Sequence, residues 1–420
     1  MVGKINKKAL IYTIGNVAYL FALWLLTVLT TRFSGYESAG VLTLAMSLGN
    51  ICTFLQMYGM RNYQASDVSR QFASGDYLRS RFFTSAASII LLAIILLFGR
   101  YPFKTSVSII LYTLFRFFEA ISDVFHGEMH RADKLDKIGV LMFARGAITV
   151  ILFLTGEAIF RSLNASLLTV AVGSAAITFT LDLPVYRKVV EMKSGSRSGV
   201  KKLLTSCFPL LIAFLLPTLI TAFPRILLEK FKGAETLGYY GNVSTPAVII
   251  TAVVPNIIAS YMPRYGELTK EGKNKETRRL WLRTLLLTLM ILAVCSAGVA
   301  LIGKPVLSLI YTESIVPYIK YLYFFLISTA LYAATMCGAA VLTARRKNVI
   351  VCVCASIAAV VCIVSSFPLV KYFGIPGAIA AMIVSYSVQA VIQLLFILKY
   401  TGIPHFKGAL KETEKKDSIS

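Results

Sequence analysis

Four ionisable side chains share one face of an apolar stretch at residues 103–127. Arg116, Glu119, Asp123 and His126 follow the spacing i, i+3, i+7 and i+10, which places them on the same side of a helix. A guanidinium group binds phosphate through paired N–H donors, and a histidine changes its charge near neutral pH. This face therefore has the chemistry to hold a polar anionic molecule or to take up an ion.

Placing these charges in apolar surroundings costs free energy. A charge at the centre of a membrane span costs about 2.5–3.5 kcal/mol, so the whole stripe facing lipid would cost on the order of 10 kcal/mol. The stripe is therefore expected to face protein or water. Arg145, in the next apolar stretch, falls at about the depth of Glu119 and Asp123, and we predict that it is their ion partner.

The elements that must position these charges are long apolar runs. Of the 420 residues, 57% are apolar and 15% are charged. In soluble proteins about a quarter of all residues are charged. One helical crossing needs about 20 apolar residues, and continuous runs favour helices over a β-barrel. We predict twelve transmembrane helices, at residues 9–31, 36–60, 82–99, 103–127, 137–157, 162–183, 203–224, 236–260, 280–302, 315–343, 347–368 and 374–398.

The net charge of +23 is explained by membrane topology. With the N-terminus inside, 31 of the 43 Lys and Arg residues fall in inner segments, 10 fall in outer loops and two lie within spans. This is the distribution of the positive-inside rule. We therefore expect both ends of a multi-pass protein on the cytoplasmic side, and no nucleic-acid partner.

A nine-residue pattern occurs twice, close to half a chain apart. Residues 32–40 (RFSGYESAG) and 230–238 (KFKGAETLG) share the order basic–Phe–x–Gly–x–Glu–Ser/Thr–x–Gly. Each copy joins two predicted spans on the predicted outer side. Gly35 and Gly233 suit the position after a helix where φ is positive, and the Ser or Thr is placed to cap the next helix. The pattern predicts equivalent turns in a duplicated chain.

The repeat predicts an all-α protein with two six-helix lobes around a central cavity. Six spans are an even number, so both lobes have the same orientation and are related by a parallel pseudo-two-fold axis. The predicted boundaries are a first lobe at 1–193, a cytoplasmic linker at 194–200, a second lobe at 201–402 and a cytoplasmic tail at 403–420.

The whole chain resembles the multidrug/oligosaccharidyl-lipid/polysaccharide (MOP) exporter superfamily. The resemblance is carried by these two turns, by the basic 264–283 segment after Pro263, and by the charged residues Arg116, Glu119 and Asp123. Within it, the chain is similar to the Wzx-type flippases of O-antigen and capsule repeat units. The resemblance implies a MATE/MOP-like fold and export of undecaprenyl-diphosphate-linked oligosaccharides across the bacterial cytoplasmic membrane by alternating access. The lipid bilayer and polysaccharide assembly proteins would be its partners. The first span has Asn16 and no carboxylate, unlike many drug and cation exporters of this superfamily.

Two interpretations of the charges stay open under this resemblance. In the first, Arg116 and Arg145 donate to the diphosphate, while the acidic side chains and His126 hold sugar hydroxyls or titrate, coupling transport to protons or sodium. In the second, Arg145, Glu119 and Asp123 form a fixed ion network that holds two helices together.

Two further arginines lie near the ends of predicted spans. Arg225, near an outer end, either meets the diphosphate in an outward-facing state or extends to the lipid headgroups. Arg61, at an inner end, either guides an anionic headgroup inward or is a topology charge. No cofactor is expected.

Two other functions remain as alternatives: multidrug or cation efflux, and a membrane polysaccharide polymerase or ligase. Enzymes of the second kind commonly use a sizeable outer loop, and every predicted outer loop here is short. The sequence has no Ser/His/Asp set, no His-Glu-x-x-His spacing and no Gly-Lys-Ser/Thr phosphate loop. All seven cysteines fall within predicted spans, which favours packing. We therefore predict a transporter without catalytic residues or a metal site.

Overall fold

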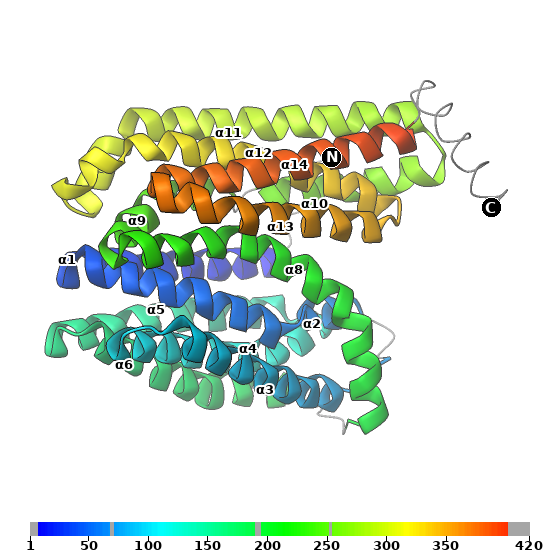
Figure 1. Cartoon of the computed structure of the whole chain (residues 1–420). Coiled ribbons are helices and arrows are strands. Elements are labelled where there is room, and N and C mark those ends of the chain that lie inside the picture. Colours follow the sequence, from blue (N-terminus) through cyan, green and yellow to red (C-terminus); the bar gives the residue numbers. More distant parts are fainter. Residues whose placement is uncertain (1–6, 68–70, 190–194, 252–253, 402–420) are drawn as a thin grey trace. The chain divides into compact units, whose positions relative to one another are not determined.

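The chain is helical throughout its described part. The computed structural model describes residues 7–67, 71–189, 195–251 and 254–401, and these residues form no strand. Long helices lie alongside one another within each half of the chain (Figure 1). The predicted all-α class is confirmed.

The helices begin and end close to the predicted spans. They are α1 (Lys7–Met57), α2 (Met60–Ser66), α3 (Ser74–Gly99), α4 (Phe103–Arg131), α5 (Leu135–Phe160), α6 (Leu163–Ile177), α7 (Leu183–Val189), α8 (Arg197–Lys232), α9 (Ala234–Thr251), α10 (Val254–Lys270), α11 (Asn274–Ile310), α12 (Lys320–Ala344), α13 (Asn348–Phe373) and α14 (Ile375–Thr401). A π-helical turn, η1 (Thr178–Asp182), joins α6 to α7, and a 3₁₀ turn, η2 (Glu313–Tyr318), precedes α12.

These helices accommodate the twelve predicted spans. Nine helices of the described part are long and apolar enough to cross a bilayer, with α6, η1 and α7 forming one of them. The longest, α1, covers two predicted spans, because Gly35 interrupts its helical geometry. The remaining two spans fall on α4 and on the pair α9 and α10. The chain is therefore a polytopic membrane protein, as predicted.

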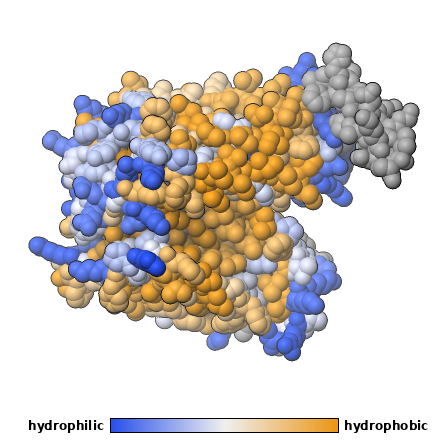
Figure 2. Space-filling view, in the orientation of Figure 1, coloured by the Kyte–Doolittle hydropathy of each residue, from blue (hydrophilic) through white to orange (hydrophobic). Residues whose placement is uncertain are grey.

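The surface supports the same conclusion. Hydrophobic side chains cover the middle of the helices, and hydrophilic side chains gather near the helix ends (Figure 2). Large apolar side chains are widely exposed, among them Leu97 at 73%, Phe103 at 83% and Leu301 at 82%. Soluble monomers rarely expose contiguous apolar patches of this kind, so these faces are suited to contact lipid.

By internal packing the chain divides into a first unit, Met1–Asn242, and a second unit, Val243–Ser420. The first unit holds α1 to α8 and the start of α9, and the second holds the rest. The two are described separately below.

The start of α8 overlaps the predicted linker at 194–200. The helix begins at Arg197, and the Ser196 hydroxyl caps it by accepting a hydrogen bond from the Gly199 backbone N–H at 3.0 Å. Residues 197–200 are therefore helical, and residue 194 lies outside the described residues. The other boundaries stay predictions: 1–193, 201–402 and the tail at 403–420, which lies outside the described residues.

In the first unit, α4 packs against α1, α2, α3 and α6. The neighbouring pair α1 and α5 meets at glycines. A Cβ on Gly15 would lie 2.0 Å from the Gly139 carbonyl oxygen, and one on Gly139 would lie 2.4 Å from the Ile11 carbonyl oxygen. Small residues let helix backbones approach closely in a membrane. This contact holds α5, which carries Arg145, beside α1.

The second unit has an apolar core between α10, α11, α12 and α14. Tyr265, Trp281, Leu292 and Cys337 are among its buried residues. The Tyr265 hydroxyl donates to the Thr284 hydroxyl at 2.9 Å, so its polar end is satisfied inside this core.

Both copies of the nine-residue pattern form the predicted turn. Gly35 has a φ of 80° and Gly233 a φ of 85°, values that favour glycine. The predicted cap is wrong for the second copy, because Thr236 already lies within α9. Its hydroxyl donates to the Lys232 carbonyl at 2.9 Å and so satisfies the end of α8 instead.

The two turns also contact each other, within the first unit. A Cβ on Gly40 would lie 1.7 Å from the Ala234 carbonyl oxygen, and one on Gly238 would lie 2.1 Å from the Tyr36 carbonyl oxygen. The rings of Tyr36 and Tyr239 stack with centroids 4.0 Å apart. Each copy thus packs its final glycine on the backbone of the other. We call this reciprocal contact the turn pair.

The turn pair leads to a stability prediction. Gly40→Ala should destabilise the protein by about 1–3 kcal/mol, because the new methyl group would overlap backbone atoms of the second turn. Gly298→Ala is the matched control, since nothing lies within 4 Å of a Cβ there. Thermal unfolding in detergent, followed by labelling of the buried cysteines, should show a midpoint several degrees lower for Gly40→Ala alone. Equal midpoints would contradict the close contact.

Candidate functional site

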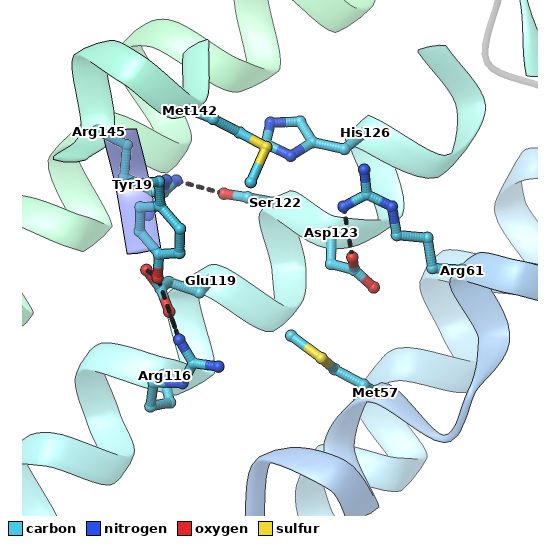
Figure 3. A pocket seen from close by; sticks show the side chains of 10 residues that line it. All are labelled: Tyr19, Met57, Arg61, Arg116, Glu119, Ser122, Asp123, His126, Met142 and Arg145. Atoms are coloured by element: carbon cyan, nitrogen blue, oxygen red, sulfur yellow. Dashed lines mark hydrogen bonds and ion pairs between the residues drawn. The ribbon is translucent and has the colours of Figure 1, made fainter. Parts of the chain in front are cut away.

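A pocket of the first unit lies beside the charged face of α4 (Figure 3). Together with the open solvent at its mouth, it comprises about 410 Å³ of space not filled by protein atoms. We call it the α4 pocket. Its lining residues come from α1, α2, α4 and α5: Tyr19, Met57, Arg61, Arg116, Glu119, Ser122, Asp123, His126, Met142 and Arg145.

Five of the six predicted site residues line this pocket. They are Arg116, Glu119, Asp123 and His126 on α4, and Arg145 on α5. The stripe therefore faces the interior of the first unit, as its cost in lipid requires. Whether these side chains bind a ligand stays a prediction.

Arg225, the sixth predicted residue, does not line the α4 pocket. It lies on α8 and is partly buried, with its guanidinium carbon 5.7 Å from the centre of the Tyr240 ring. This is a cation–π contact within the first unit. A role for Arg225 towards a ligand stays a prediction.

Arg116 and Glu119 pair within one turn of α4, and Tyr19 of α1 joins them. The Arg116 guanidinium donates to Glu119 Oε2, and the Tyr19 hydroxyl donates to Oε1 of the same carboxylate. The Arg116 side chain is 15% exposed and the Glu119 side chain is 6% exposed. The carboxylate is therefore buried, whereas part of the arginine side chain remains exposed. Tyr19 carries no charge, and the sequence has no signal for its role.

The two carboxylate oxygens of Asp123 bind different arginines. Arg61 Nη1 lies 3.0 Å from Oδ1, and Arg81 Nη2 lies 3.1 Å from Oδ2. Arg81, whose side chain is 2% exposed, also donates to the Gln56 carbonyl near the end of α1. Arg81 lies in a basic inner segment of the sequence, where it resembles a topology charge. Its burial on α3 makes it a structural partner of Asp123.

The predicted pairing of Arg145 with Glu119 and Asp123 is wrong. Arg145 pairs with Asp182, and it also donates to the Ser122 hydroxyl at 2.6 Å. The prediction used depth in the membrane alone. Each carboxylate on α4 has other arginine partners, so Arg145 turns towards η1 instead.

Asp182 reaches Arg145 because it ends the π-helical turn η1. A π turn holds one extra residue and so rotates the side chains that follow it. The Asp182 side chain is fully buried. Asp182 is the single acidic residue of the predicted 162–183 span. Because an ionisable residue inside a span needs a partner, its presence alone indicates an ion pair with a neighbouring helix.

The ion pairs around the pocket leave an excess of positive charge. Four guanidinium groups oppose three carboxylates in the ion pairs of Glu119, Asp123 and Asp182. Arg116 and Arg61 keep 15% and 23% of their side-chain surface exposed. The α4 pocket is therefore suited to an anionic ligand rather than a cationic one.

Comparison with known proteins assigns the fold. No family model matches the sequence. The chain superimposes on the inward-facing conformation of a multidrug resistance MATE family transporter of the MOP superfamily, with a TM-score of 0.70 and 14% identity, over 98% of this chain and 97% of that one. The eukaryotic MATE transporter AtDTX14 matches with a TM-score of 0.66 and 14% identity, over 94% and 95%.

One curated relative matches in sequence, over part of its length. The capsular polysaccharide biosynthesis protein CapF of Staphylococcus aureus is 26% identical over 208 residues, which are 49% of this chain. The match spans about half, 52%, of the length of that relative. The structural matches show that this chain has the two-lobed, twelve-helix fold of MATE transporters of the MOP superfamily.

The buried pair on α3 and α4 can be tested by stability. Arg81→Met leaves Asp123 with one arginine and the Gln56 carbonyl with the Thr84 hydroxyl as its side-chain donor, so it should destabilise the protein by about 3–5 kcal/mol. Arg264→Met is the matched control, because its ion pair with Glu267 is exposed and should contribute little. The readout is the melting midpoint of the purified protein in detergent. An Arg81→Met midpoint equal to that of the control would contradict the assignment.

Proposed function

We propose that this protein is a flippase that exports undecaprenyl-diphosphate-linked oligosaccharides across the bacterial cytoplasmic membrane by alternating access. The observation that carries the proposal is the arginine-rich α4 pocket inside a polytopic protein with a MATE transporter fold. The substrate class combines two phosphates with many hydroxyl groups, and the pocket has donors for the first and acceptors for the second.

Arg116 and Arg61 are the groups that we expect to contact the diphosphate. Both keep part of their surface open to the pocket, and a guanidinium fork matches two phosphate oxygens at once. In the structure their charges are balanced by Glu119 and Asp123. A diphosphate can take the place of a carboxylate as their partner, so the arginines need not be left unpaired during transport. Arg145 is buried deeper, behind its pair with Asp182.

The remaining lining groups suit a saccharide. Glu119 and Asp123 accept hydrogen bonds from hydroxyls, and the Ser122 and Tyr19 hydroxyls can donate or accept. Met57 and Met142 add adaptable apolar surface for sugar rings.

The sequence relative supports a saccharide substrate. CapF is described as a capsular polysaccharide biosynthesis protein, and it matches about half of this chain. The first span also lacks the carboxylate that many drug and cation exporters of the superfamily carry. Polysaccharide assembly proteins as partners, cytoplasmic termini and coupling to protons or sodium belong to the same proposal.

Multidrug or cation efflux is the alternative function. Solved structures with this fold include multidrug transporters, which is the observation in its favour. The excess of arginine around the α4 pocket opposes it, because a cationic drug would be repelled there. An enzymatic polymerase or ligase has less support, since the matched solved structures are transporters.

Arg116→Ala should abolish surface polysaccharide when it replaces the native gene. The loss of charged hydrogen bonds worth about 1.5–3 kcal/mol predicts roughly 10- to 100-fold weaker substrate binding. Arg116→Lys, which keeps the charge and loses the fork, should restore part of the polysaccharide. Arg264→Ala is the control, because this side chain of α10 is exposed and lies outside the α4 pocket. The measurements are surface polysaccharide by blotting and protein level in the membrane; full polysaccharide from Arg116→Ala would remove Arg116 from the site.

The two transport functions separate in cells. Deletion of the gene should lower surface polysaccharide, and overexpression should leave drug sensitivity unchanged. In liposomes, the purified protein should move a fluorescent undecaprenyl-diphosphate-linked saccharide between leaflets. Raised drug resistance together with unchanged surface glycans would favour efflux instead.

A further inference from the structure

His126 and Asp182 face each other beside the α4 pocket without a short hydrogen bond. Their Nε2 and Oδ1 atoms lie 3.5 Å apart, which is long for an N–H···O bond. The side chains are 6% and 0% exposed. Neither atom has a hydrogen-bond partner among the described residues. Buried polar atoms are rarely left unsatisfied, so this pair indicates a site that something else completes.

The other side of Asp182 is already occupied by a permanent cation. Oδ2 accepts from Arg145, whose guanidinium also donates to the Ser122 hydroxyl at 2.6 Å and the Ser174 hydroxyl at 2.9 Å. The guanidinium already occupies the space beside these oxygens and supplies their positive charge, so a metal cation is disfavoured there. A proton needs no such space, because it adds directly to a nitrogen or oxygen atom.

His126 is the residue of this region whose side chain has a ring nitrogen that can take up a proton. Arginine stays protonated in proteins, and the carboxylates are paired with arginines. The charged and titratable groups on the helices that pack there are Arg116, Glu119 and Asp123 on α4, Arg61 on α2, Arg81 on α3, Arg145 on α5, Asp182 on η1, Tyr186 on α7, and Tyr12 and Tyr19 on α1.

We infer that His126 and Asp182 form a proton-binding site linked to the anion in the α4 pocket, an inference that rests on the proposed function. One proton from solvent adds to His126 Nε2, and the resulting N–H donates to Asp182 Oδ1. The pocket then carries one more positive charge and holds a diphosphate more tightly. By linkage, the bound diphosphate strengthens proton binding by the same factor. The proton leaves when the diphosphate leaves.

This site has a consequence for transport. A diphosphate that crosses with its proton carries one negative charge less through the membrane. Each elementary charge is worth about 2.3 kcal/mol per 100 mV of membrane potential. The site therefore sets how strongly the potential acts on the loaded protein.

The test counts protons on ligand binding. Full-length protein in nanodiscs is titrated with farnesyl diphosphate by calorimetry, in buffers of different ionisation enthalpy. We expect uptake of up to one proton per diphosphate, and a Kd that falls by up to about tenfold per pH unit as the pH is lowered over the range in which the proton is taken up, the limit for one proton.

Three variants assign the proton to the pair. His126→Gln should remove the proton uptake and the pH dependence of the Kd, and Asp182→Asn should reduce both. His130→Gln, on the same helix and outside the pocket, should keep both. If Asp182→Asn does not fold because Arg145 loses its partner, His126→Gln decides alone.

The possible failures point to different conclusions. If the native protein does not bind farnesyl diphosphate, the proposed function and this inference both fall. If it binds without proton uptake, or if uptake persists in His126→Gln, the inference falls and the proposed function stands.

Discussion

A charged side chain inside a membrane span needs a partner of opposite charge or a hydrogen-bonding group. In the first unit this requirement determines which helices are joined by ion pairs. Asp123 ties α2 and α3 to α4 through two arginines, and Asp182 ties α5 to η1. Lipid provides no hydrophobic force between helices, so such pairs help to set their mutual orientation. The same pairs leave arginine surface open to the α4 pocket. The charges that pair the helices are therefore also the charges that line the pocket.

The chain repeats its backbone pattern without repeating this chemistry. Among the described residues, every buried charged side chain belongs to the first unit, whereas the buried polar side chains of the second unit are Ser, Thr and Gln. Gln393, for example, is buried on α14 with its amide atoms unsatisfied among the described residues. Among the described residues, buried charged side chains are thus confined to the first unit.

Helix faces and glycine turns could be predicted from the sequence, whereas the ion pairs between helices could not. Helical periodicity is local, so the spacing from Arg116 was enough to find the face that lines the pocket. Positive φ at Gly35 and Gly233 also follows from a short pattern. Asp182 stands out in the sequence as an isolated acid in an apolar span, but its pairing with Arg145 depends on η1, where one extra residue rotates its side chain inward. These contacts are decided by packing between helices, which one sequence does not record.

The turn pair brings two copies of one pattern into reciprocal contact. In oligomers such a contact is isologous, because the same surface patch meets itself across a two-fold axis. A six-helix ancestor with a single copy would already have carried a surface able to pair with itself in the same membrane orientation. Joining two such chains end to end would require no new interface, and each half would then be free to change separately.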